Sequence, residues 1–286
     1  MEKITIGVIG GSGLYHMADL EDHETVSLDT PFGKPSDDFH LGSLRGRRVA
    51  FLPRHGRGHR IMPTELPFRA NIHGFRQLGV EHLISVSAVG SMKEEIAPGH
   101  LVLPDQFIDL TKGRPATFFG GGVVGHIPFD KPTCSSLSSV LHRAGEKAGA
   151  VMHKGGTYVC IEGPQFSTLA ESLLYRSWGV DIIGMTNMPE ARLAREAEIC
   201  YSTLALATDY DCWHENEEVS VEQILKIIKA NVKTAQDIIR RSVEDLSAPR
   251  TCNCCRALEN AVLTHRESVS PEARERLSLI LGKYWK

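Results

Sequence analysis

The sequence contains no apolar run approaching the ~20 residues that a membrane-spanning helix needs, so we expect no membrane partner. Its formal net charge is only −3, so electrostatics gives no reason to expect nucleic acid as a partner. A signal-peptide pattern is absent, because the chain enters a β-branched run at Ile4, and we expect a cytoplasmic location. Repeats, low-complexity tracts and a domain linker are also lacking. The 286 residues therefore suffice for one large α/β domain.

Cysteine is modest in number and odd in count, with seven residues in all. Four stand alone in apolar or strand-end contexts, typical of buried free thiols: Cys134, Cys160, Cys200 and Cys212. The other three form the cluster Cys252, Cys254 and Cys255. A zinc site normally needs a second ligand pair at a distance, and His265 alone is a poor candidate. We therefore expect no metal and simple thiols, with a local redox or disulfide role as the alternative.

Strand and helix patterns alternate across the first 210 residues, which predicts an α/β domain followed by helical segments at 220–286. Strands are predicted at 4–9, 47–53, 83–91, 101–103, 107–108 and 199–207, with two more ending near Ile161 and Gly184. Helices are predicted at 67–78, 132–149 and 220–246.

Two glycine-rich turns follow predicted strands near the N-terminus. Gly10-Gly11-Ser12-Gly13 is not the dinucleotide fingerprint, because His16 stands where the third glycine would fall. It is either a tight turn or a small nest of backbone N–H groups for an anion. In the second, five of the seven residues 54–60 can carry positive charge, which at a strand end favours an oxyanion site over a plain surface run.

Three later strands end in polar or aromatic residues, at Phe166, at Met185-Thr186 and at the pair Asp209 and Asp211. Ligands of open α/β sheets bind just beyond the carboxyl ends of strands. Because the two aspartates are two residues apart, both can face one ligand edge, although aspartate also favours turns for backbone reasons.

These pieces, taken in order, resemble the methylthioadenosine phosphorylases of the purine nucleoside phosphorylase family. The matching segments are 9–13, 30–36, 54–56, 88–91, 161–164, 185–186 and 208–213, and the resemblance covers nearly the whole chain up to about Asp245. The resemblance implies a single α/β domain (residues 1–286) with a twisted mixed sheet closing toward a distorted barrel among helices. It further implies a homotrimer or a dimer of trimers, inorganic phosphate as co-substrate, and no metal or organic cofactor.

The resemblance also assigns residues to the parts of the substrates. Phosphate would lie among Ser12, Arg54, His55, Ser87, Ala88 and Thr186. The nucleoside would contact Met185, Phe166, Asp209, Asp211, Val221 and Ile224, with His126 reaching in from a neighbouring subunit. The family often has threonine where Ser12 and Ser87 stand, and both changes keep the hydroxyl.

The implied reaction is the reversible phosphorolysis of S-methyl-5′-thioadenosine to adenine and 5-methylthioribose 1-phosphate. Such a reaction passes through a sugar with oxocarbenium character and needs a proton for N7 of the departing purine. Asp209 and Asp211 are the catalytic candidates, because one of two close carboxyl groups can retain a proton. A carboxylate also accepts a hydrogen bond from the adenine amine, whereas it repels the carbonyl of a 6-oxopurine.

Three alternatives stay open at the level of sequence. A phosphorylase of methylthioinosine or 6-oxopurine nucleosides is the nearest, because the Asn187 amide follows the key threonine and is a candidate to reach the base. A hydrolytic nucleosidase is the second. A non-catalytic nucleoside-binding protein on the same fold is the third.

Overall fold

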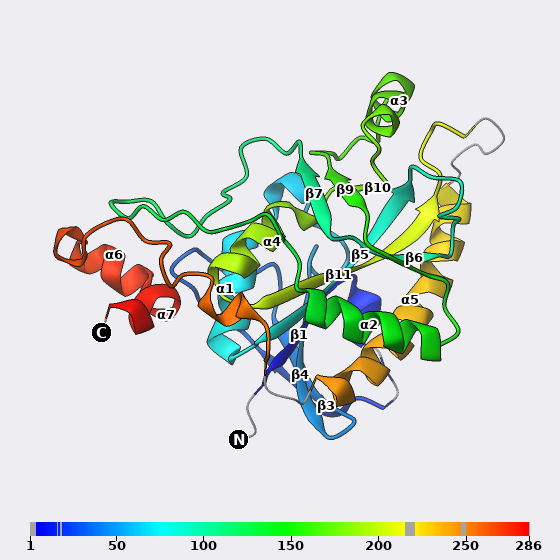
Figure 1. Ribbon diagram of the computed structural model, residues 1–286. Helices are drawn as coiled ribbons and strands as arrows, with labels where there is room; N and C mark the ends of the chain where they lie inside the picture. Colours follow the sequence, from blue (N-terminus) through cyan, green and yellow to red (C-terminus); the bar gives the residue numbers. More distant parts are fainter. Residues whose placement is uncertain (1–3, 16, 18, 215–220, 247–249, 286) are drawn as a thin grey trace.

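The computed structural model describes residues 4–15, 17, 19–214, 221–246 and 250–285. Within them, eleven strands form one mixed sheet with helices packed against it (Figure 1). The strands are β1 Ile6–Gly10, β2 Glu21–Val26, β3 Phe39–Leu44, β4 Arg47–Pro53, β5 His82–Ser91, β6 Leu101–Leu103, β7 Gln106–Asp109, β8 Met152–Lys154, β9 Thr157–Cys160, β10 Ile182–Gly184 and β11 Cys200–Asp209. The predicted α/β class with a mixed sheet among helices is confirmed.

The helices are α1 Phe68–Leu78, α2 Ser135–Lys147, α3 Leu169–Ser177, α4 Asn187–Glu196, α5 Val221–Asp245, α6 Pro271–Arg276 and α7 Ser278–Leu281. Helix α1 ends as predicted, because Gly79 caps it in the left-handed conformation (φ 91°) that costs glycine little. The predicted helix 220–246 is α5, although Ser220 lies outside the described residues. Residues 250–285 form short helices and 3₁₀ turns.

Strand β5 is the centre of the sheet. It pairs in parallel with β1 and β11, and its last residues pair antiparallel with β10. Side chains alternate across the sheet: Leu83 belongs to the apolar cluster that includes α1 and α4, whereas Ile84 belongs to the cluster that includes α2 and α5. Because β1, β4, β5 and β11 run parallel, their carboxyl ends meet at one edge of the sheet.

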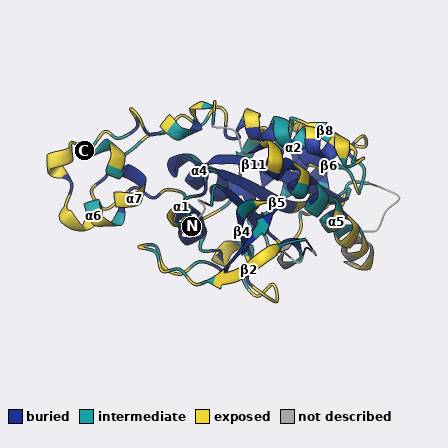
Figure 2. Cartoon of the chain, turned by 90° about the horizontal axis from the view of Figure 1, so that it is seen from below, coloured by how far each residue is buried: buried dark blue, intermediate teal, exposed yellow. Residues whose placement is uncertain are grey.

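Two parts project from this body in Figure 1: the C-terminal helices α6 and α7, which Figure 2 also shows, and helix α3. The C-terminal residues 250–285 pack beside the loop 118–128, where the amide of His126 donates to the carbonyl of Ala261 (2.7 Å) and that of Leu263 to Val124 (2.9 Å). Helix α3 stands out elsewhere and exposes apolar side chains, Leu169, Leu173, Leu174 and, just after it, Trp178. Among the described helices, none combines the length and apolar character needed to cross a bilayer.

Candidate active site

A cavity of about 630 Å³ opens at the edge where the parallel strands end. Nine of the residues assigned by resemblance line it: Arg54, His55, Ser87, Ala88, Phe166, Met185, Thr186, Asp209 and Asp211. Further lining residues include Gly11, Leu14, His59, Pro63, Val86, Val89, Gly90, Ser167, Thr208, Ile228 and Val232. The structure therefore gathers side chains that lie up to 218 positions apart (from Leu14 to Val232) around one space.

Arg54, the first residue after β4, is held by a buried ion pair that sequence reasoning missed. Its guanidinium meets both carboxylate oxygens of Glu190, with Nε 2.8 Å from Oε2 and Nη2 3.0 Å from Oε1. Nη2 also donates to Ser85 Oγ (2.7 Å), and Nη1 donates to the carbonyl of Val86 (2.9 Å). Burial acts to lower the pKa of Arg54, but Glu190 raises it above its ordinary value. The cation is therefore permanent and fixed in direction.

The anchoring network continues behind Arg54. Tyr201 donates its hydroxyl to Glu190 Oε1 (2.8 Å), and Ser85 donates to the same oxygen (2.7 Å). The amide of Asn187 donates to Tyr201 Oη (2.6 Å) and to Ser85 Oγ (3.0 Å) and is fully buried. Asn187 does not line the cavity, so the suggestion that its amide reaches the base is wrong. Its amide instead donates to the buried hydroxyl groups of Tyr201 and Ser85.

Two hydroxyl groups lie beside Arg54 in the cavity. Ser87 Oγ and Thr186 Oγ1 are 3.0 Å apart, which brings together the carboxyl-terminal part of β5 and the residue that precedes α4. Gly11 also lines this region, and Ser12 begins the adjacent 3₁₀ turn Ser12–Tyr15, although its side chain lies outside the described part. Hydroxyl groups and a fixed guanidinium are suitable partners for phosphate oxygens.

His55 is neutral at physiological pH, although it is one of the five residues in 54–60 that can carry positive charge. Burial lowers the pKa of His55 to about 4, and the adjacent Arg54 lowers it as well. Its Nδ1 lies 2.8 Å from the carbonyl oxygen of Ile61, which fixes the proton on Nδ1 and leaves Nε2 as an acceptor. His59 stacks on the ring at 4.3 Å and also lines the cavity.

The aspartate pair occupies the end of β11, as predicted. A shift of register between Ala207 and Asp209 marks an irregularity at this point, of the kind that re-aims side chains near active sites. Asp209 Oδ1 accepts from the backbone amide of Asp211 (2.8 Å), and Oδ2 accepts from the Thr208 hydroxyl (2.6 Å). Ser167 Oγ donates to the Asp211 carboxylate at 3.2 and 3.3 Å. Each carboxylate is therefore oriented by its own hydrogen bonds.

Gly90 makes room for these carboxylates. A Cβ at this position would lie 3.0 Å from Asp209 Oδ1 and 3.5 Å from the Cβ of Asp211. Any larger residue here would push the pair away from β5.

A second buried arginine, Arg114, positions the segment that carries Met185. Its Nη1 donates to the carbonyl oxygens of Met185 (2.7 Å) and Met188 (2.9 Å), and its Nε donates to Glu162 Oε1 (3.0 Å). Sequence reasoning missed Arg114, because it lies in a loop far from any motif. Phe166 also lines the cavity, and 69% of its surface is exposed within one chain.

The apolar wall of the cavity comes from α5 through Ile228 and Val232. Val221 and Ile224 lie in the first turns of the same helix, but their side chains fall outside the described part. The spacing of Ile224, Ile228 and Val232 is the i, i+4, i+8 pattern of one helix face. That periodicity is visible in the sequence and was the signal for Ile228 and Val232.

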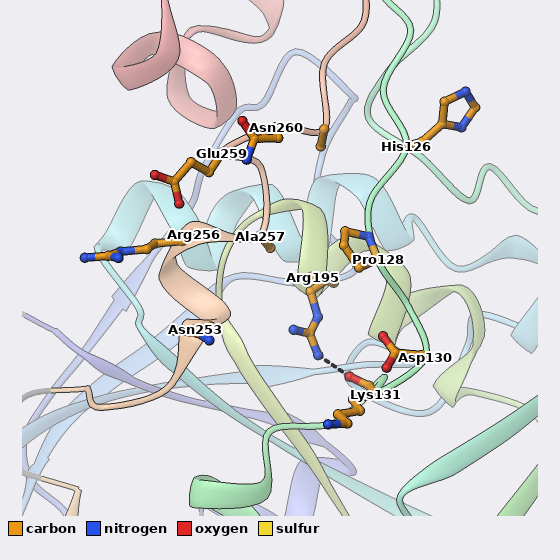
Figure 3. Close-up of a pocket in the computed structure, with 11 residues that line it drawn as sticks. His126, Pro128, Asp130, Lys131, Arg195, Asn253, Arg256, Ala257, Glu259 and Asn260 are labelled. Atoms are coloured by element: carbon orange, nitrogen blue, oxygen red, sulfur yellow. Dashed lines mark hydrogen bonds between the residues drawn. The ribbon is translucent and has the colours of Figure 1, made fainter.

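His126 lies apart from this site. It borders a second cavity of about 440 Å³ between the loop 126–131 and the C-terminal segment 253–261 (Figure 3). There its ring points away from Arg195, whose guanidinium donates to the carbonyl of Lys131. Within one chain, the structure does not bring His126 to the aspartates.

Comparison with known proteins agrees with the geometry of the site. Residues 5–244 match the phosphorylase superfamily, and the chain belongs to this family. It is 59% identical over 286 residues to the S-methyl-5′-thioadenosine phosphorylase of Geobacter sulfurreducens, covering 99% of this chain and 100% of the relative. The resemblance indicated by the motifs is thereby confirmed. The similarity also continues past Asp245, the point to which the motifs had extended the resemblance.

Solved structures show the same likeness. A methylthioadenosine phosphorylase from an antarctic soil metagenomic library has a TM-score of 0.94 and 48% identity, covering 98% of this chain and 100% of that one. The methylthioadenosine phosphorylase of Schistosoma mansoni in complex with adenine has a TM-score of 0.84 and 34% identity, covering 90% of this chain and 96% of that one.

Proposed function

We propose that the chain catalyses the reversible phosphorolysis of S-methyl-5′-thioadenosine, giving adenine and 5-methylthioribose 1-phosphate. The observation that carries the proposal is the shared cavity, which joins a phosphate-binding end to a carboxylate edge. Ser87 is at the first end, and Gly90, which pairs with Asp209, is at the second. Three residues along a strand span about 10 Å. This is the length scale of a phosphate and a nucleoside placed in line.

The phosphate end supplies charge, donors and one acceptor. Within the described contacts, Arg54 uses four of its five N–H groups (one on Nε, one on Nη1 and two on Nη2), which leaves one on Nη1 for the anion. Ser87 and Thr186 add hydroxyl groups. The His55 Nε2 acceptor suits the single P–OH of HPO₄²⁻. We infer that these residues hold phosphate against the anomeric carbon, with no metal or organic cofactor.

The carboxylate edge favours adenine over a 6-oxopurine. Asp209 and Asp211 offer acceptors for the exocyclic amine and a carboxyl group that can deliver a proton to N7. The Asn187 amide was the feature that favoured methylthioinosine and other 6-oxopurine nucleosides. Because it donates to Ser85 and Tyr201 in the core, it is not available to a base in the cavity. No further observation favours that alternative.

The apolar wall supports a 5′-methylthio group. Ile228 and Val232 offer no partner to a 5′-hydroxyl, so adenosine would leave its hydroxyl unpaired there, at a cost of about 1–3 kcal/mol. A thioether needs no such partner.

We further propose a homotrimer acting in the cytoplasm. Exposed Leu173 and Trp178 around α3, and the exposed ring of Phe166, favour burial against another subunit. His126 lies outside the candidate active site of its own chain, and this position fits a contribution to the active site of a neighbouring subunit. The seven free cysteines are typical of a reducing compartment.

The decisive experiment is turnover of methylthioadenosine with and without phosphate, with both products identified. We expect adenine and 5-methylthioribose 1-phosphate, and no turnover without phosphate. Equal rates in its absence, with free methylthioribose as product, would identify a hydrolase instead.

The base assignment has its own test in Asp209→Asn, which keeps the shape but removes the carboxyl proton. Loss of general acid catalysis costs roughly 100- to 10,000-fold in kcat/KM. The amide donor also faces a 6-carbonyl favourably, so the ratio of kcat/KM for methylthioadenosine over methylthioinosine should fall. An unchanged ratio would mean that this carboxylate does not touch the base edge.

A further inference from the structure

Four cysteines outside the active site lie together in the folded chain. They come from three distant segments: Cys134 precedes α2, Cys200 is the first residue of β11, and Cys252 and Cys254 belong to the C-terminal segment. Their four Sγ atoms all lie within 4.8 Å of one another. Three of the residues are buried and Cys252 is partly buried. We call this group the cysteine cage.

Local backbone contacts fix the members of the cage. The amide of Cys134 donates to the carbonyl of Tyr201 (2.7 Å), so the start of α2 is tied to the start of β11. Cys252 has an extended backbone (φ −87°, ψ 161°) and leads into the 3₁₀ turn Asn253–Arg256, which brings the nearby Cys254 back toward it. The Sγ atoms of Cys200 and Cys252 are 3.2 Å apart.

The cage provides the second ligand pair that the sequence did not reveal. The Cys-x-Cys pair at 252 and 254 is met by Cys134 and Cys200, which are far away in the chain. We propose that the cage binds one Zn²⁺ through four cysteine thiolates, as a structural site that fastens the C-terminal segment to β11 and α2. This proposal replaces our expectation of simple thiols and is independent of the reaction proposed above.

The dimensions of the cage fit a single ion. A tetrahedral site with Zn–S bonds of about 2.3 Å has sulfur–sulfur edges of about 3.8 Å. This edge lies between the 3.2 Å separation of Cys200 and Cys252 and the 4.8 Å limit for the whole group. Four sulfur ligands in tetrahedral geometry favour zinc among divalent ions and leave no open position for water or substrate. The site is therefore structural and not catalytic.

The surroundings of the cage suit a buried, negatively charged thiolate centre. Arg250 donates to the carbonyl of Glu198 (2.8 Å) and pairs with Glu81 (3.3 Å), whose carbonyl in turn accepts from the amide of Cys200 (2.9 Å). Arg250 thus links the C-terminal segment to the residues that precede β11, one of the connections that the ion would reinforce, and its charge offsets part of the charge of four thiolates. Leu137 and Leu204 belong to the apolar cluster around the cage and limit access by water.

The cage lies far from the cavity, so its loss can be separated from loss of catalysis. Cys200 is at the amino end of β11 and Asp209 at its carboxyl end, and nine residues of strand span about 30 Å. What the ion would secure is the C-terminal segment, whose other ties to the residues before β11 include Arg250 and the contacts of Lys283 and Tyr284 with the Glu198 carboxylate.

The test is metal analysis of the full-length protein, purified without a metal-binding tag from cells supplied with zinc. We expect about one zinc ion per chain in the wild type and in Cys255→Ser, the matched control, because Cys255 is adjacent to the cage but outside it. Cys134→Ser and the double variant Cys252→Ser/Cys254→Ser should lose the ion. They should also unfold the C-terminal segment at lower temperature than the control, as followed by hydrogen exchange.

A titration of the wild type avoids variants that do not fold. Stepwise modification of thiols with a mercurial reagent should release zinc to a colorimetric indicator, and Co²⁺ in place of zinc should give the visible absorption of tetrahedral thiolate coordination. Iron in place of zinc, zinc retained in Cys134→Ser, or a zinc-free protein whose intact mass shows disulfide bonds would each overturn the proposal. After the last result, peptide mapping that places a disulfide bond between Cys200 and Cys252 would identify that contact as a redox pair.

Discussion

The buried pair of Arg54 and Glu190 makes the strongest prediction about phosphate use. Only 3% of the Arg54 side chain and 1% of the Glu190 side chain are exposed. In Arg54→Met the carboxylate of Glu190 stays buried without its cation, which typically costs about 3–5 kcal/mol of folding free energy. For a chain of this size that corresponds to a fall in Tm of roughly 5–8 °C. Loss of activity in this variant alone is therefore ambiguous.

The double variant Arg54→Met/Glu190→Gln separates the two effects. Its glutamine removes the unpaired charge yet keeps an acceptor for the hydroxyl groups of Ser85 and Tyr201. We expect most of the lost Tm to return. By contrast, kcat/KM for phosphate should stay about 100-fold or more below wild type, equivalent to about 2.7 kcal/mol, because the guanidinium is still missing.

The assays are thermal unfolding and phosphate-dependent release of adenine at saturating nucleoside. Arg240→Met is the matched control. Arg240 lies on α5 and forms an ion pair with Asp19, and neither residue lines the cavity. It should lower Tm and leave the phosphate KM unchanged. Recovery of phosphate use in the double variant would refute the reasoning, because Arg54 would then serve only the fold.

Three further predictions concern pH, specificity and the cysteines. Burial raises the pKa of Glu196 to about 7, whereas the unfolded carboxyl titrates near 4.5. Between pH 4.5 and pH 7 the unfolded state therefore binds fewer protons than the folded state. The free energy of unfolding should fall by about 3 kcal/mol as the pH rises through this range. Glu196→Gln should abolish that difference between urea unfolding at pH 4.5 and pH 8, and an equal loss in both proteins would contradict the assignment. Ile228→Ser should reduce the preference for methylthioadenosine over adenosine roughly 10-fold or more in kcat/KM, and an unchanged ratio would place the 5′ group elsewhere. Replacing Cys252, Cys254 and Cys255 together by serine should leave kcat/KM near wild type at moderate temperature while lowering Tm; a tenfold fall in activity with the oligomer intact would show a catalytic role.

Local patterns in the sequence were sufficient to predict the elements that present the site. The run that became β11 is apolar because the strand is buried on both faces, and the aspartates at its end are visible as the point where that run stops. Strand β2 was not predicted, because every residue from Glu21 to Thr25 is exposed and the segment pairs only along one edge. The extended conformation of β2 depends on its pairing with β3, and no alternation of apolar residues within β2 indicates that pairing.

Contacts between distant residues account for what the sequence could not predict. Arg54 and Glu190 are 136 positions apart, and no pattern in the sequence links the predicted oxyanion-site residue Arg54 to Glu190. The cysteine cage is the same case: the pair at 252 and 254 lacked partners until the fold placed Cys134 and Cys200 beside it. Spacing rules detect ligands that are close in the chain, and they miss a site assembled by tertiary structure.

Asn187 directly follows Thr186 in the sequence, but the two side chains point to different parts of the structure. Its neighbour Met188 has non-helical angles (φ −115°, ψ 131°) although both stand at the start of α4. Thr186 then faces the cavity while Asn187 points into the network of Tyr201 and Ser85. Under the proposed function, the preference for adenine would therefore rest on Asp209 and Asp211, because the Asn187 amide donates to Tyr201 and Ser85.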